Sequence, residues 1–542
     1  MSTADPTGEW QPTATSTRIV VGVTLGVVAL LLWSVPGMIE PTLIGVFGAA
    51  CLTASLWLVR GGVRDSGTAF VAGILTVPAA GGLIGGAGLA ALLVTSRVFP
   101  AASGAQVSVS ALIIVGNVGV FLGCVLALLG VALGVRNVVD DGTLEDFISV
   151  GLHTAVAPVV ATGLYVLRAV LSGSDAGSVR LPDLPVSVLL SPDSGAIHIA
   201  GLLVLVGVAA WTMAAALTVL PVAELLADTG RSQTTDTRVT KAYYLLIGGG
   251  AVTAFLGLVA LPAELLVSTG DVRSVLGDPL WRLLAAVSNS SLLRLSLVAV
   301  LVLAAVGAAV GAVARTLSRD ERWRARPGVD HSPPDQQGPA AAGVLLTLLA
   351  VGVADSAYEG IVTGVADRLP AVMGRQLREA ATDAALVYGE ATFTVLFATV
   401  LIVSVVGFAQ VLRGAIGVGY LSAETTGYSL ASAGLFVSIV FAATLDVPTW
   451  LIFGGVVASL LVWDAGRFGT VLGREVGGGG SGTRSMELVH AGGTGLVGLA
   501  GALVAALAAS RFEGGLVAES PLSTVALLSV VFGALAFAAA LR

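Results

Sequence analysis

Long apolar runs constrain the fold of this chain more than any other feature. They recur along nearly all of its 542 residues, separated by short polar interruptions. A helix that rises about 1.5 Å per residue needs about 20 apolar residues to cross the roughly 30 Å hydrocarbon core of a bilayer. Helices suit such runs because backbone polar groups inside lipid must be satisfied within the segment. The sequence therefore predicts an all-α fold, a polytopic transmembrane helix bundle.

The composition supports the same class. Hydrophobic residues make up 56% of the chain and charged residues 11%, whereas soluble domains carry roughly 25% charged residues. No polar stretch between the runs is long enough to form a soluble domain. We expect a multi-pass protein of the cell membrane, in contact with the lipid bilayer along most of its length.

The polar interruptions divide the chain into about 14 predicted spans. A cytoplasmic tail covers 1–18, spans one to eight occupy 19–314, and an arginine-rich cytoplasmic loop follows at 315–340. Spans nine to fourteen occupy 341–542 and include a glycine-rich cytoplasmic loop near 464–487. The predicted spans are 19–35, 41–59, 68–95, 107–134, 147–171, 196–220, 242–262, 292–314, 341–361, 385–411, 429–445, 449–463, 488–510 and 522–541.

The distribution of basic residues predicts the orientation, since cytoplasmic loops carry an excess of Lys and Arg. With the N-terminus in the cytoplasm, the inside segments hold roughly twice as many of the 27 basic residues as the outside segments. Both termini are therefore predicted to be cytoplasmic. The five arginines at the start of the 315–340 loop favour contact with anionic lipid headgroups, and a protein partner is the alternative.

Missing motifs narrow the classes of function. The single lysine, Lys241, follows Thr240 and not glycine, which excludes a phosphate-binding loop that ends in Gly-Lys-Ser/Thr. The four histidines form no clustered metal-binding pattern. Basic residues do not alternate with aromatic residues as they do on nucleic-acid surfaces. We therefore expect no enzymatic activity, no cofactor, no metal site and no nucleic-acid partner.

Three carboxylates near the outer side are the first candidate site. Asp355 and Glu359 are four residues apart and share one helix face, and the next span begins near Glu390 on the same side of the membrane. These groups can line an outward vestibule that takes up protons or cations. Alternatively, they lie at the level of the lipid headgroups and pair with arginines of the intervening loop.

Asn117 is the second candidate. It lies near the middle of a predicted span, where an amide needs a hydrogen-bonding partner from a neighbouring helix. It serves either to hold two helices together or as part of a polar site.

Glycines four residues apart predict close helix packing. Gly81 is paired in this way with Gly85, and Gly82 with Gly86. Such spacing lets two helix backbones approach closely in a membrane. The pattern predicts a compact bundle and indicates no substrate.

Two short phrases near the C-terminus are distinctive. They are DAGRFG at 464–469 and ELVHAGGT at 487–494. The chain here resembles an uncharacterised family of haloarchaeal multi-pass membrane proteins in which these phrases occur in the same order. The resemblance implies a membrane protein and supplies no activity.

Glu487 and His490, in the second phrase, form the third candidate site. They are one helical turn apart at the predicted cytoplasmic face, which permits a proton-accepting pair. The alternative is a helix-start glutamate beside an interfacial histidine.

Two functions from different classes remain open. The first is a membrane scaffold or assembly subunit that acts with separately encoded partners, which the absent catalytic motifs, the arginine-rich loop and the glycine pattern favour. The second is a proton- or ion-coupled secondary transporter, which the number of spans and the group Asp355, Glu359 and Glu390 favour. A polar cavity that reaches the middle of the bundle would favour the transporter.

Overall fold

The computed structural model describes residues 12–60, 65–98, 105–136, 138–173, 198–219, isolated positions between 239 and 257, 278–317, 337–445, 447–476 and 483–512. Within these ranges the chain is helical and contains no strand. The helices are α1 (Ala14–Ser34), α2 (Ile39–Val59), α3 (Ser66–Val98), α4 (Ala105–Arg136), α5 (Asp141–Gly173), α7 (Ile199–Val219), α11 (Asp278–Ser288), α12 (Ser291–Leu317), α13 (Gln337–Gly352), α14 (Ala354–Ala366), α15 (Ala371–Tyr388), α16 (Glu390–Gly417), α17 (Thr426–Ala442), α18 (Thr449–Val476) and α19 (Arg484–Phe512).

The predicted all-α membrane bundle is confirmed for this part of the chain. Nine of the described helices are long and apolar enough to cross a membrane, and the number rises to ten if the bent pair α13 and α14 forms one span. The chain is therefore a multi-pass membrane protein. The predicted span at 522–541 lies outside the described residues, as does most of the 315–340 loop, and 242–262 is described only at isolated positions. The total of about 14 spans stays a prediction.

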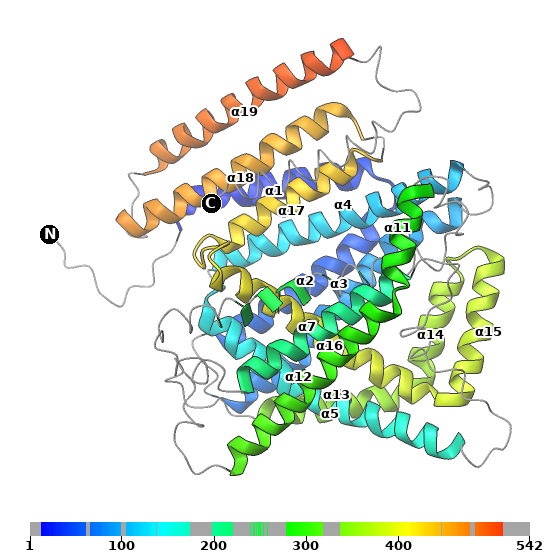
Figure 1. Cartoon of the computed structure of the whole chain (residues 1–542). Coiled ribbons are helices and arrows are strands. Elements are labelled where there is room, and N and C mark those ends of the chain that lie inside the picture. The colour runs from blue at the N-terminus through cyan, green and yellow to red at the C-terminus, as the bar shows by residue number, and fades with distance from the viewer. Residues whose placement is uncertain are drawn as a thin grey trace.

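Helix α4 forms the centre of the bundle, and α17 packs along it (Figure 1). Glycines bring the two backbones into direct contact. A Cβ added at Gly434 of α17 would lie 2.3 Å from the backbone nitrogen of Ala127 and 2.6 Å from the carbonyl oxygen of Gly123. A Cβ at Gly130 of α4 would lie 2.3 Å from the nitrogen of Ala431. Only glycine permits this approach, because any side chain would overlap the facing helix.

Of the two predicted glycine pairs on α3, the pair Gly82 and Gly86 makes close contacts with neighbouring helices. Gly82 meets Gly48 of α2 backbone to backbone, since a Cβ added at Gly82 would lie 2.6 Å from the Cα of Gly48. A Cβ added at Gly86 would lie 2.6 Å from the side-chain ring of Phe121 on α4 and 2.7 Å from the carbonyl oxygen of Pro41 on α2. In contrast, no described atom lies within 4 Å of a Cβ added at Gly85. The four-residue spacing of the glycines predicted close helix packing. The positions of α2 and α4 determine which of these glycines form the contacts.

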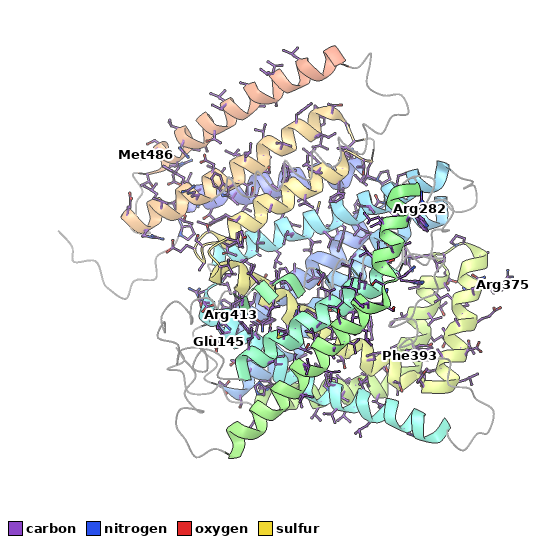
Figure 2. All side chains as sticks on the ribbon, viewed as in Figure 1. Glu145, Arg282, Arg375, Phe393, Arg413 and Met486 are labelled. Atoms are coloured by element: carbon purple, nitrogen blue, oxygen red, sulfur yellow. The ribbon has the colours of Figure 1, made fainter. Side chains whose placement is uncertain are left out.

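Ion pairs join the start of α5 to the last turns of α16. Arg413 contacts Asp141 at 3.0 Å and Glu145 at 2.9 Å. Helix α5 begins at Asp141, earlier than the predicted 147, because Asp140 accepts hydrogen bonds from the amide and the hydroxyl of Thr143 and so caps the helix. Figure 2 shows Arg413 and Glu145 together at one end of the long helices, with Arg375 at the other end.

A buried arginine fixes the start of α12. Arg294, which is predicted to lie inside a span, is fully buried. Its guanidinium donates to the carbonyl oxygen of Ser288 at 2.8 Å and to that of His198 at 2.7 Å. It therefore joins the end of the amphipathic helix α11, which the sequence did not predict, to the start of α7.

The predicted span at 341–361 is not one straight helix. It breaks at Val353 into α13 and α14, whose axes are bent by 71°. Helix α13 has 16 residues and is apolar, whereas α14 carries Asp355 and Glu359 near its start. Because charged side chains are costly in hydrocarbon, α14 turns away from the direction of the span.

The segment after α14 is also helical, although the sequence predicted a loop there. Helix α15 begins after Pro370 and ends at Gly389, whose φ of 80° requires a residue without a side chain. Figure 1 shows α14 and α15 side by side at one end of the bundle, across the direction of the long helices. We call this pair the outer hairpin.

Helix α18 is longer than predicted. The sequence placed its end at 463 and a loop near 464–487, but the helix continues to Val476. Its 28 residues span about 42 Å, more than the hydrocarbon core requires. The DAGRFG phrase is therefore part of a helix, with Gly466 against Tyr428 of α17 and Gly469 against Ser16 of α1.

We expect opposite labelling at the two ends of the bundle. Arg375→Cys on the outer hairpin should react with a membrane-impermeant maleimide added to intact cells, and Glu475→Cys on α18 should react only after the cells are opened. Both positions are exposed, and the native Cys51 and Cys124 are buried, so they contribute little background. The reverse pattern would show that the predicted orientation is wrong.

Candidate functional site

A polar pocket lies between the outer hairpin and the start of α16. Its volume is about 400 Å³. Asp355 and Glu359 come from α14 and Glu390 is the first residue of α16, so the structure brings the three predicted carboxylates together around one pocket. The remaining lining residues are Tyr358, Val362, Thr363, Arg378, Ala381, Thr382, Ala385 and Leu386.

The charges of this outer pocket are unbalanced. Asp355 and Glu359 both lie near enough to Glu390 to act electrostatically on its carboxylate. Two carboxylates at such a distance repel each other unless a proton or a cation lies between them. Arg378 is the basic residue of the lining, and its guanidinium is paired with Asp367. The pocket therefore favours a positively charged group.

Aromatic side chains pack in and beside the pocket. The hydroxyl of Tyr358 donates to the carbonyl oxygen of Ala381 at 2.7 Å, which ties α14 to α15. The ring of Tyr358 lies 5.4 Å from that of Phe393 on α16, and Tyr388 meets the same ring edge-on at 6.2 Å. Figure 2 shows Phe393 near the base of the outer hairpin. A contact of 3.9 Å between Arg368 and Glu40 links the hairpin to α2.

The outer pocket opens at the surface and does not enter the bundle. All of its lining residues belong to α14, to α15 or to the first position of α16. Asp355 and Glu359 are exposed. Within the described residues, no group of three His, Cys, Asp or Glu side chains is arranged to hold a metal ion. The geometry suits a basic side chain or a small organic cation.

A second polar cluster lies at the opposite end of the molecule, around Glu487. This carboxylate is only 2% exposed. One of its oxygens accepts from the hydroxyl of Thr13 at 2.7 Å, the amide of Ser16 at 2.7 Å and the hydroxyl of Ser16 at 2.9 Å. The other accepts from Thr483 at 2.8 Å. Glu487 thus joins the start of α19 to the start of α1.

His490 has a different partner from Glu487. Its Nε2 atom lies 2.9 Å from Oδ2 of Asp464 on α18, and its ring stacks on Phe468 with centroids 4.1 Å apart. Thr494 donates to the same oxygen of Asp464 at 2.5 Å. Of the two alternatives for Glu487 and His490, the described contacts do not form the proton-accepting pair, since each side chain has its own partner. The phrases DAGRFG and ELVHAGGT meet across the α18–α19 interface.

Asn117 belongs to neither cluster. It is 5% exposed on α4, beside Gly116, whose added Cβ would lie 2.4 Å from the hydroxyl of Thr444. This position among packed helices fits the structural alternative for Asn117. Sequence reasoning missed Asp464, which it placed in a loop, and Thr13 and Ser16, which it placed in a tail. A continued helical pattern through 464–476 was the signal available for Asp464.

Comparison with known proteins gives a partial match. Residues 375–538 match the model of a family of unknown function, DUF7519. The matched segment begins in α15 and contains α16 to α19, so it includes both phrases and part of the outer hairpin. No curated protein and no solved structure matches the chain.

Proposed function

We propose that this chain is a non-catalytic assembly subunit of the cell membrane, which holds a separately encoded partner protein through the outer pocket. The observation that carries the proposal is the position of that pocket. It is formed by the outer hairpin beside the long helices, where a partner can reach it. A route for a transported substrate would instead enter the bundle.

The packing of the bundle also supports a scaffold. Helices α4 and α17 are in backbone contact at several glycines, and α2 and α3 touch at Gly48 and Gly82. Contacts of this kind leave no room between the helices concerned and resist the sliding that alternating access requires. A rigid bundle is well suited to presenting a surface hairpin in a fixed geometry.

The charge of the outer pocket defines the contact that we propose. Asp355, Glu359 and Glu390 present carboxylate oxygens, and the apolar wall includes Val362 and Leu386. An arginine or lysine side chain of the partner would bring its charge to the carboxylates and its methylene groups to that wall. The arginine-rich loop at 315–340 remains a proposed second contact, with lipid headgroups or with a protein.

A proton- or ion-coupled transporter is the second candidate. The break between α13 and α14 favours it, because transporters use interrupted helices to build ion sites. In that case Asp355 and Glu390 would take up the coupling ion from the outer side.

Photocross-linking tests the first proposal. Leu386 lines the outer pocket and is 80% exposed, so a benzophenone amino acid at this position should capture the partner in cells. We expect Asp355→Asn together with Glu390→Gln to reduce the adduct roughly tenfold, because charge-assisted hydrogen bonds contribute about 1.5–3 kcal/mol. Glu379→Gln together with Asp383→Asn is the matched control: both lie exposed on α15 outside the pocket lining, and the adduct should persist.

Reconstituted vesicles separate the two candidates. Under an imposed proton or sodium gradient, the wild-type protein should give no cation flux above that of protein-free vesicles. A flux that Asp355→Asn abolishes, with no adduct at Leu386 in cells, would replace the scaffold with the transporter.

A further inference from the structure

The outer pocket lies at the level where the hydrocarbon of a membrane meets the lipid headgroups. Helix α16 begins at Glu390 in the pocket and runs 28 residues to Gly417, about 42 Å away. Near that far end, Arg413 forms its ion pairs with Asp141 and Glu145. Because a bilayer has roughly 30 Å of hydrocarbon between its two polar layers, these two charged clusters mark the two membrane surfaces.

The helices of the outer hairpin stay close to this level. Helix α13 has 16 residues and rises about 24 Å before the break at Val353, less than the thickness of the hydrocarbon. After the bend of 71°, α14 carries the apolar Ile361, which is 46% exposed, as well as its acids. On α15, Leu386 is 80% exposed at the pocket. A group that binds the carboxylates therefore also meets apolar surface, which favours a ligand that is itself embedded in the membrane.

An exposed apolar face of α16 leads from the pocket into the membrane. Phe397 follows Glu390 by seven residues, so the two side chains lie on the same face of the helix. Phe397 is 43% exposed, and Val400 on the next turn is 41% exposed. Farther along, α7 approaches α16, since a Cβ added at Gly407 would lie 3.7 Å from the ring of Trp211. Between the pocket and that contact, a second helix can lie against this face.

We propose that the partner is itself anchored in the membrane, by a helix that lies along this face of α16 and ends in an arginine or lysine bound in the outer pocket. The inference rests on the proposed function, since it names the class of partner that the pocket holds. A basic residue at the end of a membrane helix carries its charge into the headgroup layer on a long apolar stem. The carboxylates of Asp355 and Glu390 lie where that charge arrives.

Charge complementarity explains why such a helix would bind here. In lipid, no hydrophobic effect drives one apolar helix onto another, so packing and polar contacts determine association. Arg378, the basic residue of the pocket lining, is already paired with Asp367, and the lining keeps an excess of negative charge for the partner. A soluble partner would reach the pocket only from the water side and would make no contact with Phe397.

Photocross-linking at two depths tests the position of the partner. A benzophenone amino acid replaces Leu386 at the pocket in one full-length protein and Phe397 in another, where it takes the place of an exposed aromatic side chain. We expect both to capture the same protein in cells. The peptide linked at position 397 should belong to an apolar segment of about 20 residues with an arginine or lysine next to its end.

Val497 is the matched control for Phe397. It is an apolar residue, 75% exposed, on α19, which packs on α18 at the edge of the molecule (Figure 1). The same benzophenone amino acid at this position should not capture the partner. Capture at Val497 with a yield equal to that at Phe397 would show random contact within the membrane and would overturn the inference.

The charge dependence of the adducts links the helix to the pocket. Asp355→Asn together with Glu390→Gln should reduce the adduct at Phe397 roughly tenfold, as it does at Leu386, because both adducts depend on the same charge-assisted contact. Replacing the basic residue at the end of the partner's helix with alanine should have the same effect. An adduct at Phe397 that neither change reduces would also overturn the inference.

Two outcomes separate this inference from the proposed function. A charge-dependent protein adduct at Leu386 with none at Phe397 would mean that the partner approaches from the water side, which overturns the membrane-anchored partner and leaves the assembly function standing. No protein adduct at either position, or adducts with lipid alone, would overturn both.

Discussion

Replacing Glu487 with alanine is expected to lower the free energy of unfolding by about 3 kcal/mol. The carboxylate is buried and accepts four hydrogen bonds, three of them from residues of α1 and its N-terminal flank. Its removal would leave the hydroxyls of Thr13 and Ser16 and the amide of Ser16 without their acceptor, and each unsatisfied buried donor costs about 1–3 kcal/mol. Partial replacement of the lost acceptor by water keeps the total below the sum of these costs.

The measurement is an unfolding titration of the purified protein in mixed micelles. Glu475→Ala is the matched control, because Glu475 is an exposed acid near the same end of the bundle, and its loss should change stability by less than about 0.5 kcal/mol. Glu487→Gln keeps one acceptor oxygen and should fall between the two. Equal free energies of unfolding for Glu487→Ala and Glu475→Ala would show that the contact between α19 and α1 does not stabilise the folded protein.

Replacing Gly434 with leucine is expected to have the largest effect of all, the loss of the folded bundle. The first side-chain atom alone would overlap the backbone of Ala127 and Gly123 on α4. Neither helix can yield locally, because both sides of the contact are backbone, so α17 must move away from α4 along its length. Overpacking costs of about 1–3 kcal/mol apply where side chains can adjust, and this site lacks that freedom.

Gly454→Leu is the matched control for Gly434→Leu. Gly454 lies in α18, and nothing in the described part of the chain is within 4 Å of a Cβ added there. The control protein should elute as a single folded species in size-exclusion chromatography, whereas the Gly434 variant should aggregate or be degraded. Gly434→Ala should show a smaller defect of the same kind. A folded Gly434→Leu protein with wild-type stability would contradict the close α4–α17 contact.

The sequence by itself determined the class of the molecule. Length and apolarity of the runs predict membrane helices because lipid offers the backbone no other partner. For this reason the prediction at 41–59 lies within two residues of α2, which spans Ile39–Val59. Helical spacing also grouped Asp355 with Glu359, since residues four apart share a face.

Only the tertiary structure decided where polar segments belong. The sequence assigned DAGRFG to a loop, because a charge at the end of an apolar run ordinarily marks the membrane surface. For Glu487 it left two readings open, a proton-accepting pair with His490 and a helix-start glutamate beside an interfacial histidine. In the folded chain, Asp464 remains in a helix because His490 and Thr494 satisfy its carboxylate. Glu487 is buried because residues some 470 positions earlier donate to it.

The outer hairpin illustrates the same limit. Asp355 and Glu359 within 341–361 fit either a break or a span whose end lies at the headgroups, and the charges of α15 resemble those of a loop. The turn at Val353 places Asp355 and Glu359 beside Glu390 and the hydroxyl of Tyr358 beside the carbonyl of Ala381. The local pattern of apolar and polar residues indicates the free-energy cost of placing each side chain in lipid or in water. Whether a distant side chain removes that cost depends on contacts between segments that periodicity does not encode.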